Sequence, residues 1–532
     1  MPNPNRLMLA VVLSSAFLAF AGPSADASTS TLARIRRTPT PTPIPSATPT
    51  PTPGTTGATF VKIYANILNN TQASVTPEDV QSTSDGGYIA LAITQAPQSL
   101  NAVGVSWLVK LDSSGNAQWQ KELGCFGTPP GDYADGVSTQ QAADGGYVVG
   151  GGTIGCGSGS ICPSSSGIQC GLVEKLDPTG TVTWARVYLA GAAGTAITRI
   201  SRTTDAGYIA VGSSTDAAQN TGALILKLDS LGNVQWQREL GPSGSTQAYF
   251  NAVQQTSDGG FVATGEFYVP SAGTPQTSVL VVKLDSSGTM QWQHGFNHLS
   301  TSGSPDAVEH ALSVIQSADG AFAVAGNWTN STQPGQCCSG ALLLKLQSNG
   351  SIQWQNAYSG GVYCFFNGFS ETCTNIGGVI YSLHQTADAG YVLAGSGELE
   401  LTDSVPLVPW AAKVDASGNL VWQHFYYQTN PATGRTLSQY FASSTLTSGG
   451  ALAALGFTEN LTNGLGELYA VQTDNSGLVG TCNEVRNATP LKAINPALTS
   501  TAPSLGIQTA IVEIGNSPAT TLSTSIKSTR DC

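Results

Sequence analysis

The residues of this sequence most suited to chemistry are five histidines, the aspartates and ten cysteines. His298 and His310 flank one loop, where they could share a metal ion or have no common role. Asp132 and Asp135, in the stretch GDYADG, could bind calcium or form a plain turn. No His-Glu-x-x-His, Gly-x-Ser-x-Gly or phosphate-binding glycine loop occurs. The sequence therefore predicts no catalytic residue, no metal site and no cofactor.

The clearest candidate binding element is the stretch YCFFNGFSETC, residues 363–373. It places three phenylalanines between two cysteines in an otherwise polar loop. Exposed aromatic side chains on a tethered loop suit a glycan or a protein partner, although the rings could instead fold under the loop as a small core. With two tryptophans from loops of neighbouring repeats, the candidate binding residues are Tyr363, Phe365, Phe366, Phe369, Trp328 and Trp410.

The ten cysteines fall into three groups along the chain. These groups are Cys125, Cys156, Cys162 and Cys170, then Cys337, Cys338, Cys364 and Cys373, and finally Cys482 with Cys532. An even number in an exported chain suggests five disulfides. Within each group of four, three pairings are possible, and whether the adjacent Cys337 and Cys338 bond to each other is open. The absence of a Cys-x-x-Cys pair argues against structural zinc.

Two phrases recur along the chain and indicate the elements that must position these residues. KLDSSGNAQWQKELG, residues 110–124, returns in copies that begin at Lys175, Lys227, Lys283, Lys345 and Lys413. TSDGGYIALA, from Thr83, returns at Ala142, Thr203, Thr256, Ser317, Thr386 and, in a worn form, Thr447. Asp-Gly-Gly before alternating apolar residues predicts one hairpin, and Asp-x-x-Gly predicts a second.

Two hairpins per unit imply four strands, here called A to D, and seven units of about 60 residues imply a seven-bladed β-propeller. An open solenoid is the alternative, but it would leave two sheet edges that need caps. The A-to-B and C-to-D turns should share one rim, the turn rim. The B-to-C and D-to-A connections, which carry every long insertion and eight cysteines, should form the opposite connection rim, where we expect binding.

The spacing Asp-x-x-Gly-x-x-x-Trp resembles the tryptophan-docking motif of quinoprotein-type β-propellers. The resemblance implies that an aromatic ring from each outer strand packs against the neighbouring blade, and the residues concerned are Trp119, Trp184, Trp236, Trp292, Trp354, Trp422 and Phe60. His294 and His424, two residues after their tryptophans, are expected to face solvent.

The same resemblance implies an alternative function, a quinoprotein-like oxidoreductase that uses a propeller-bound quinone. Adjacent Cys337 and Cys338 resemble the vicinal disulfide of the quinone-dependent alcohol dehydrogenases. Those enzymes have eight blades, however, and this sequence offers no match to their calcium ligands or catalytic aspartate. The repeat class also includes a non-catalytic scaffold of outer-membrane assembly, so the fold alone does not decide between the functions.

The seventh unit ends in TDNSGLVGTC and has no motif tryptophan. At the other end of the sequence, Phe60, Lys62 and Tyr64 have the spacing of the outer-strand residues. We therefore predict that residues 58–65 form the outer strand of the last blade and close the ring. The predicted fold is all-β, a seven-bladed β-propeller of four-stranded antiparallel blades closed by an N-terminal outer strand.

The predicted organisation is a signal peptide at 1–27, a Thr/Pro-rich linker at 28–57, the propeller at 58–482 and a Ser/Thr-rich tail at 483–532. The signal peptide ends in an Ala25-x-Ala27 pattern, so the protein should be secreted or extracytoplasmic, in the periplasm or at the cell surface. The packing of the tail stays open.

A net charge of −12 disfavours nucleic acid and anionic membranes as partners, and no later segment suits a transmembrane span. The function predicted from the sequence is a monomeric, non-catalytic binding or surface-interaction module for a protein or glycan ligand.

Overall fold

The computed structural model describes residues 59–480, apart from gaps in the connections between strands, and seven short strands within residues 485–531. The proposed signal peptide and linker lie outside the described residues. Strands and turns make up the described residues, which contain no helix. Among these residues, no helix could therefore cross a membrane.

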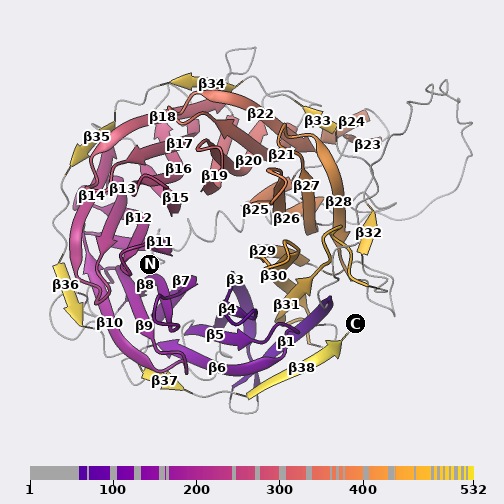
Figure 1. Ribbon diagram of the computed structural model, residues 1–532, viewed down its shortest axis with the longest axis horizontal. Helices are drawn as coiled ribbons and strands as arrows, with labels where there is room; N and C mark the ends of the chain where they lie inside the picture. The colour runs from indigo at the N-terminus through magenta and orange to yellow at the C-terminus, as the bar shows by residue number, and fades with distance from the viewer. Residues whose placement is uncertain are drawn as a thin grey trace, which may run out of the picture. The chain divides into compact units, whose positions relative to one another are not determined.

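Seven antiparallel blades of four strands form a ring, and in blades 1 to 6 the sequence runs from the axis to the outside (Figure 1). The inner A strands of blades 1 to 7 are β3 (Ser74–Ser82), β7 (Tyr133–Gln141), β11 (Gly194–Arg202), β15 (Ala248–Gln255), β19 (Ala307–Gln316), β25 (Gly378–Gln385) and β29 (Gln439–Leu446). The B strands are β4 (Tyr88–Gln95), β8 (Tyr147–Ile154), β12 (Tyr208–Thr215), β16 (Phe261–Val269), β20 (Phe322–Asn330), β26 (Tyr391–Glu398) and β30 (Leu452–Glu459).

The C strands are β5 (Val105–Leu111), β9 (Cys170–Leu176), β13 (Thr221–Leu228), β17 (Gln276–Leu284), β21 (Cys338–Leu346), β27 (Leu407–Val414) and β31 (Gly466–Gln472). The outer D strands are β6 (Ala117–Gly124), β10 (Val182–Leu189), β14 (Val234–Pro242), β18 (Met290–His298), β22 (Ile352–Ser359), β28 (Leu420–Tyr426) and, for blade 7, β1 (Phe60–Leu68). The predicted seven-bladed fold is confirmed.

The N-terminal strand closes the ring as predicted. β1 pairs antiparallel with β31, so that Phe60 lies opposite Gln472 and Tyr64 opposite Leu468. The Tyr64 hydroxyl donates a hydrogen bond of 2.5 Å to the backbone oxygen of Gly115 in blade 1. A short strand, β2 (Thr71–Gln72), then pairs with the end of β1 before the sequence enters blade 1. The first and last segments of the propeller therefore share one blade.

Both turns of each blade are built by the recurring residues. Gly86 and Gly115, in the two turns of blade 1, have φ of +81° and +76°, a conformation that favours glycine. Lys110, at the end of strand C, places its Nζ 2.8 Å from Oδ2 of Asp85 in the A-to-B turn. This ion pair joins the two turns on one rim, and it recurs as Lys175–Asp144, Lys227–Asp205, Lys283–Asp258, Lys345–Asp319 and Lys413–Asp388.

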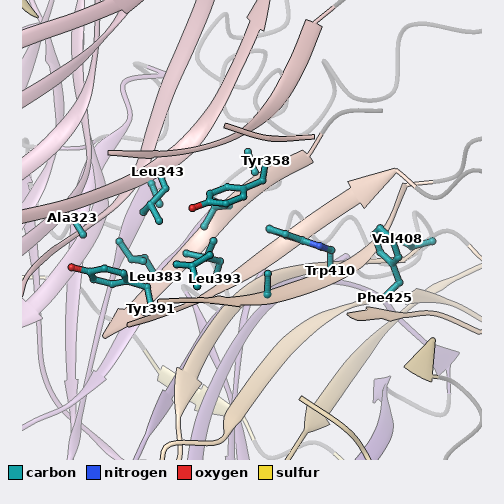
Figure 2. Close-up of a cluster of buried hydrophobic side chains, with 14 of the residues drawn as sticks. Ala323, Leu343, Tyr358, Leu383, Tyr391, Leu393, Val408, Trp410 and Phe425 are labelled. Atoms are coloured by element: carbon teal, nitrogen blue, oxygen red, sulfur yellow. The ribbon is translucent and has the colours of Figure 1, made fainter. Parts of the chain in front are cut away.

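Neighbouring blades pack through apolar clusters that their B, C and D strands share. Figure 2 shows the cluster between blades 5 and 6, where Leu343 and Tyr358 of blade 5 meet Tyr391 and Leu393 of blade 6. All four side chains are almost completely buried. The core is thus divided among the blade interfaces, and each blade depends on both of its neighbours.

The motif aromatic residue of each outer strand lies over the turn glycine of the next blade. A Cβ on Gly232 would lie 2.8 Å from Cζ3 of Trp184, so only glycine, here at φ +79°, allows the indole to approach. The seven pairs are Phe60 with Gly115, Trp119 with Gly180, Trp184 with Gly232, Trp236 with Gly288, Trp292 with Gly350, Trp354 with Gly418 and Trp422 with Gly477.

The expectation that His424 faces solvent is wrong. Only 6% of its surface is exposed, because its ring stacks on Trp422 with centroids 5.2 Å apart. Its Nε2 lies 2.9 Å from the backbone oxygen of Ser476 in blade 7. The histidine therefore belongs to the interface between blades 6 and 7.

The tail adds a fifth strand to every blade. In chain order, β32 (Val485–Asn487), β33 (Lys492–Ile494), β34 (Leu498–Thr501), β35 (Leu505–Gln508), β36 (Glu513–Asn516), β37 (Thr520–Leu522) and β38 (Ser525–Asp531) pair with β28, β22, β18, β14, β10, β6 and β1. These strands, yellow in Figure 1, follow the outside of the ring in the reverse order of the blades.

Candidate functional site

The predicted binding stretch contains a β-hairpin on the D-to-A connection between blades 5 and 6. Its strands are β23 (Val362–Phe366) and β24 (Glu371–Asn375), which form a separate two-stranded sheet. Figure 1 shows this hairpin outside the ring, near β22 and β33. Phe369 and the side chains of Tyr363, Phe365 and Phe366 lie outside the described part of the structure. Their role in binding stays a prediction.

The two tryptophans expected beside this hairpin are core residues. Trp328 is 6% exposed and packs in the cluster between blades 4 and 5. Trp410 is 2% exposed, packs between blades 5 and 6 and donates a hydrogen bond of 3.3 Å to Oε1 of Gln423 (Figure 2). Neither indole offers a face to a ligand, because each is buried in a blade interface. Their assignment to the binding surface is therefore corrected.

The structure places four of the ten cysteines in informative positions. Cys162 and Cys170 form a disulfide that joins the B-to-C connection of blade 2 to strand β9. Cys364 lies directly opposite Cys373 in the register of β23 and β24. The remaining members of the two predicted groups, apart from Cys338 at the start of β21, lie outside the described residues. The first group thus contains one of its possible pairs.

The inner strands carry a feature that recurs in all seven blades. Each A strand has a register shift across one residue near its middle, which marks a β-bulge. The bulge residue is partly exposed, as is the residue two places before it, while the residue between them is buried. Because the inner strand is the strand nearest the axis, these partly exposed residues lie around the axis of the ring (Figure 1).

We call these residues the axial set. At the bulge they are Glu78, Val137, Thr198, Asn251, Leu312, Tyr381 and Ala442, and two places earlier they are Thr76, Asp135, Ala196, Tyr249, His310, Val379 and Tyr440. The bulge residues lie near the middle of each strand, and the residues two places earlier lie nearer to the D-to-A connection and so to the connection rim. Unlike the turns, they differ from blade to blade.

A buried carboxylate, Asp79, fixes the strands beneath the axial set. Its Oδ1 lies 3.1 Å from Nη1 of Arg199 in blade 3 and accepts a hydrogen bond of 2.8 Å from the Ser443 hydroxyl of blade 7. Its Oδ2 accepts a hydrogen bond of 2.9 Å from the backbone nitrogen of Thr139 in blade 2. One side chain thus joins inner strands of four blades, and its hydrogen bonds indicate a structural role.

Glu78, next to Asp79, is an acid of the axial set with a perturbed pKa. Burial, together with the neighbouring carboxylates of Asp135 and Asp79, raises the pKa of Glu78 well above its ordinary value. Glu78 therefore keeps its proton to higher pH than a free glutamate and can donate a hydrogen bond. Its protonated carboxyl group can offer a ligand both a donor and an acceptor.

Aromatic and imidazole groups complete the axial set. The Tyr440 ring stacks on Phe457 with centroids 5.4 Å apart and planes 10° apart, which holds it in one orientation. Burial raises the pKa of the Tyr440 hydroxyl, so this group stays neutral. His310 forms an ion pair with Glu266 through Nδ1. Burial acts to lower the pKa of His310, but the effect of Glu266 is larger, so the pKa of His310 is raised above its ordinary value.

The structure gives no support to the metal sites considered from the sequence. His310 is bound to Glu266, and the side chain of His298 lies outside the described residues. Asp132 is also outside them, so the suggested calcium turn is not described. Within the described part of the chain, no group of three or more histidine, cysteine, aspartate or glutamate side chains is placed to hold a metal ion.

Sequence reasoning missed the axial set because the inner strands carry no repeated phrase. The available signal was positional, since the bulge residue lies five places before the first residue of each Asp-Gly-Gly phrase. That position holds a glutamate, a tyrosine and an asparagine in different blades, whereas the flanking positions are mostly apolar or small.

Comparisons with known proteins identify no family. No protein-family model matches the sequence, and no curated protein matches it. One similar solved structure is that of MPT-4, a mannose phosphorylase from Leishmania mexicana, in complex with phosphate ion. It has 10% sequence identity and a TM-score of 0.26, and the match covers 51% of this chain and 80% of that chain. Pyrococcus horikoshii acylaminoacyl peptidase has 11% identity and a TM-score of 0.25, with 69% and 57% covered. At these TM-scores the likeness supports no argument about function.

Proposed function

We propose that this chain is a non-catalytic binding module that recognises a hydroxyl-rich ligand, such as a glycan, at the axial set. The observation that carries the proposal is the placement of four polar residues on four adjoining blades. They are Tyr381 on blade 6, Tyr440 on blade 7, Glu78 on blade 1 and Asp135 on blade 2. Tyrosine rings stack on the apolar faces of sugars, while carboxyl groups and hydroxyls bond to sugar hydroxyls.

The division between the two rims supports this location. On the turn rim, six blades repeat the same lysine and aspartate pair and the same glycine turns, which offer a ligand little that differs between blades. The axial set differs in every blade and lies on a scaffold whose hydrogen bonds are already made. A preorganised site of this kind loses little entropy on binding.

We further propose that the protein is secreted or extracytoplasmic. The Ala25-x-Ala27 pattern and the Cys162–Cys170 disulfide support this location, because disulfides persist in oxidising compartments. The contacts between indoles and glycines of neighbouring blades also support the resemblance to the quinoprotein-type repeats, as an architecture rather than as an activity.

The resemblance leaves a quinone-dependent oxidoreductase as the alternative function. Among the described residues, no group of three or more acidic, histidine or cysteine side chains is placed to hold the calcium ion that accompanies such a quinone. Addition of pyrroloquinoline quinone and calcium to the full chain tests the alternative. A thermal shift together with dye reduction would replace the binding proposal.

The binding proposal is tested by titrating the full chain against a panel of immobilised oligosaccharides. We expect Glu78→Ala and Tyr440→Ala each to weaken capture by about tenfold or more, which corresponds to about 1.4 kcal/mol. Val421→Ser, at a residue 58% exposed on outer strand β28, is the matched control and should leave capture unchanged.

A third variant separates the axial set from the hairpin. Changing Phe365, Phe366 and Phe369 together to serine should leave capture unchanged if the axial set is the site. Loss of capture in this variant alone, with both axial variants unaffected, would move the site to β23 and β24 and contradict the proposal.

A further inference from the structure

The interface that closes the ring contains a buried polar pair. Asn66, near the end of β1 in blade 7, is 0% exposed, and Glu122, on β6 of blade 1, is 1% exposed. Nδ2 of Asn66 donates a hydrogen bond of 3.0 Å to Oε1 of Glu122. The two side chains therefore join the strand that closes the ring directly to blade 1.

An amide and a carboxyl group meet in this way at the closing interface alone, according to the alignment of the repeats. Asn66 lies two positions after Tyr64 on its outer strand, and Glu122 lies one position before Leu123, which is the equivalent of Tyr64. At the other six interfaces the equivalent residues are Cys125 with Val187, Ala190 with Glu239, Pro242 with Gly295, His298 with Ala357, Gly360 with Phe425 and Gln428 with Ile63. The pair thus distinguishes the one interface that joins the two ends of the ring.

The hydrogen bond between the two groups leaves two buried oxygens without a donor. Oδ1 of Asn66 and Oε2 of Glu122 have no hydrogen-bond partner among the described residues. Each oxygen belongs to the same planar group as an atom of the 3.0 Å bond, which keeps the two groups adjacent. Burying an acceptor without a donor costs free energy, and burying an unpaired carboxylate costs more. A proton on Glu122 removes both costs.

We propose that Glu122 is protonated in the closed ring and that its Oε2 hydroxyl donates a hydrogen bond to Oδ1 of Asn66. The acid and the amide then form a closed pair with one hydrogen bond in each direction, which we call the latch. Loss of the proton at higher pH removes one of these bonds and leaves a buried charge. The end of β1 then separates from blade 1, so the ring opens at its closing interface.

The environment of Glu122 favours the neutral acid. Burial raises the pKa of Glu122 above its ordinary value, and the hydrogen bond from Asn66 offsets part of this rise. A raised pKa in the folded chain contributes stability that is complete below the pKa of the unfolded chain. This contribution is lost as the pH rises through the pKa of the folded chain, so the latch weakens toward alkaline pH.

The titratable groups on β1 and β5 have other partners. On β1, Nζ of Lys62 donates a hydrogen bond of 2.7 Å to Oδ1 of Asn116, and the Tyr64 hydroxyl bonds to the same turn of blade 1. On β5, Lys110 forms its ion pair with Asp85 on the turn rim. None of these groups is bonded to Glu122.

The charged residues of the remaining neighbouring strands are also engaged elsewhere or lie outside the described residues. On β6, Lys121 packs against blade 2, because a Cβ on Gly180 would lie 3.0 Å from its Cγ. On β31, Glu467 accepts a hydrogen bond of 2.6 Å from Asn460. The tail strands β37 and β38 pair with β6 and β1, and the side chains of their charged residues, Lys527, Arg530 and Asp531, are not among those described.

Hydrogen exchange of the full chain, followed by mass spectrometry from about pH 5 to about pH 9, tests the latch. Exchange is expressed as protection factors, which remove the pH dependence of the chemical exchange rate. We expect amides of β1 to lose at least tenfold more protection over this range than amides of β14, an outer strand of blade 3. Equal changes in β1 and β14 would overturn the proposal, because the ring would then open no more readily at this interface than elsewhere.

Glu122→Gln separates the latch from other effects of pH. Glutamine keeps a donor and an acceptor at this position and does not ionise, so the additional loss of protection in β1 should fall to less than twofold. Glu239→Gln is the matched control, since Glu239 has the same position on β14 but its equivalent partner is Ala190. This control should keep the wild-type difference between β1 and β14. Persistence of that difference in Glu122→Gln would overturn the proposal, and the wild-type series remains decisive if a variant fails to fold.

Discussion

Glu174 is a buried acid in a position that the other blades fill with apolar residues. It lies on β9, is 1% exposed, and neither of its carboxylate oxygens has a hydrogen-bond partner among the described residues. The equivalent residues, one before the lysine position of each C strand, are Val109, Leu226, Val282, Leu344, Ala412 and Val471. Burial raises the pKa of Glu174 from 4.5 to about 7.

The raised pKa makes the free energy of unfolding depend on pH in a defined direction. In the unfolded chain Glu174 loses its proton near pH 4.5, whereas in the folded chain it keeps the proton until about pH 7. Between these values a rise in pH favours the unfolded chain, and above pH 7 the loss of stability is complete. A pKa difference of this size corresponds to roughly 3 kcal/mol.

Glu174→Gln tests this reasoning, because glutamine has the shape of the protonated acid and does not ionise. Urea unfolding of both proteins should give equal midpoints near pH 4.5 and a higher midpoint for the variant at pH 8, by an amount equivalent to roughly 3 kcal/mol. Parallel midpoints across this range would refute the reasoning, since Glu174 would then ionise equally easily in both states. Glu174→Leu should add stability at both pH values, because leucine occupies the position in two other blades.

Two further predictions concern ring closure and the turn rim. Phe60→Ala should lower the free energy of unfolding by about 3–5 kcal/mol, because Phe60 is buried against blade 1. A urea midpoint for this variant that is no lower than that of the surface variant Val421→Ser would contradict closure of the ring by β1. Partial burial opposes the ionisation of Asp205, but hydrogen bonds from Lys227 and Thr203 lower its pKa to about 2. The contribution of the ionised Asp205 to stability is therefore present above about pH 4 and is lost as the pH falls toward 2. Asp205→Asn should therefore have a lower urea midpoint than the wild type at pH 7. Between about pH 4 and 2 the variant should lose less stability than the wild type. Identical plots of urea midpoint against pH for the two proteins would show that the Lys227–Asp205 pair contributes nothing to stability.

The repeated residues made most of the fold predictable. Each Asp-Gly-Gly and Asp-x-x-Gly phrase specifies a turn through glycine's positive φ, and turns at a fixed interval specify the number of strands. The closing strand was also predictable, because Phe60 and Tyr64 keep the spacing of the other outer strands. These features depend on local backbone geometry and on one repeated contact, and both leave a pattern in the sequence.

The candidate site was less predictable, since burial depends on contacts between blades. Trp328 lies near the end of β20 and Trp410 within β27, and the long connections next to these strands suggested exposure, yet the neighbouring blade covers both. The seven tail strands left a weak pattern in the sequence because backbone groups form their pairings and many side-chain types fit them. Only the spacing of Pro490, Pro496 and Pro503 pointed to its period.

The contrast between repeated and single residues is itself evidence about function. A residue that recurs in six blades, such as the lysine paired with a turn aspartate, is explained by a contact that every blade needs. A residue that occurs once has no such explanation, and burying a carboxyl group costs stability. Glu78 is such a residue, because burial and the nearby carboxylates of Asp135 and Asp79 raise its pKa. A ligand hydroxyl that bonds to Glu78 would offset part of that cost, which is why the axial set is a better candidate than the uniform turn rim.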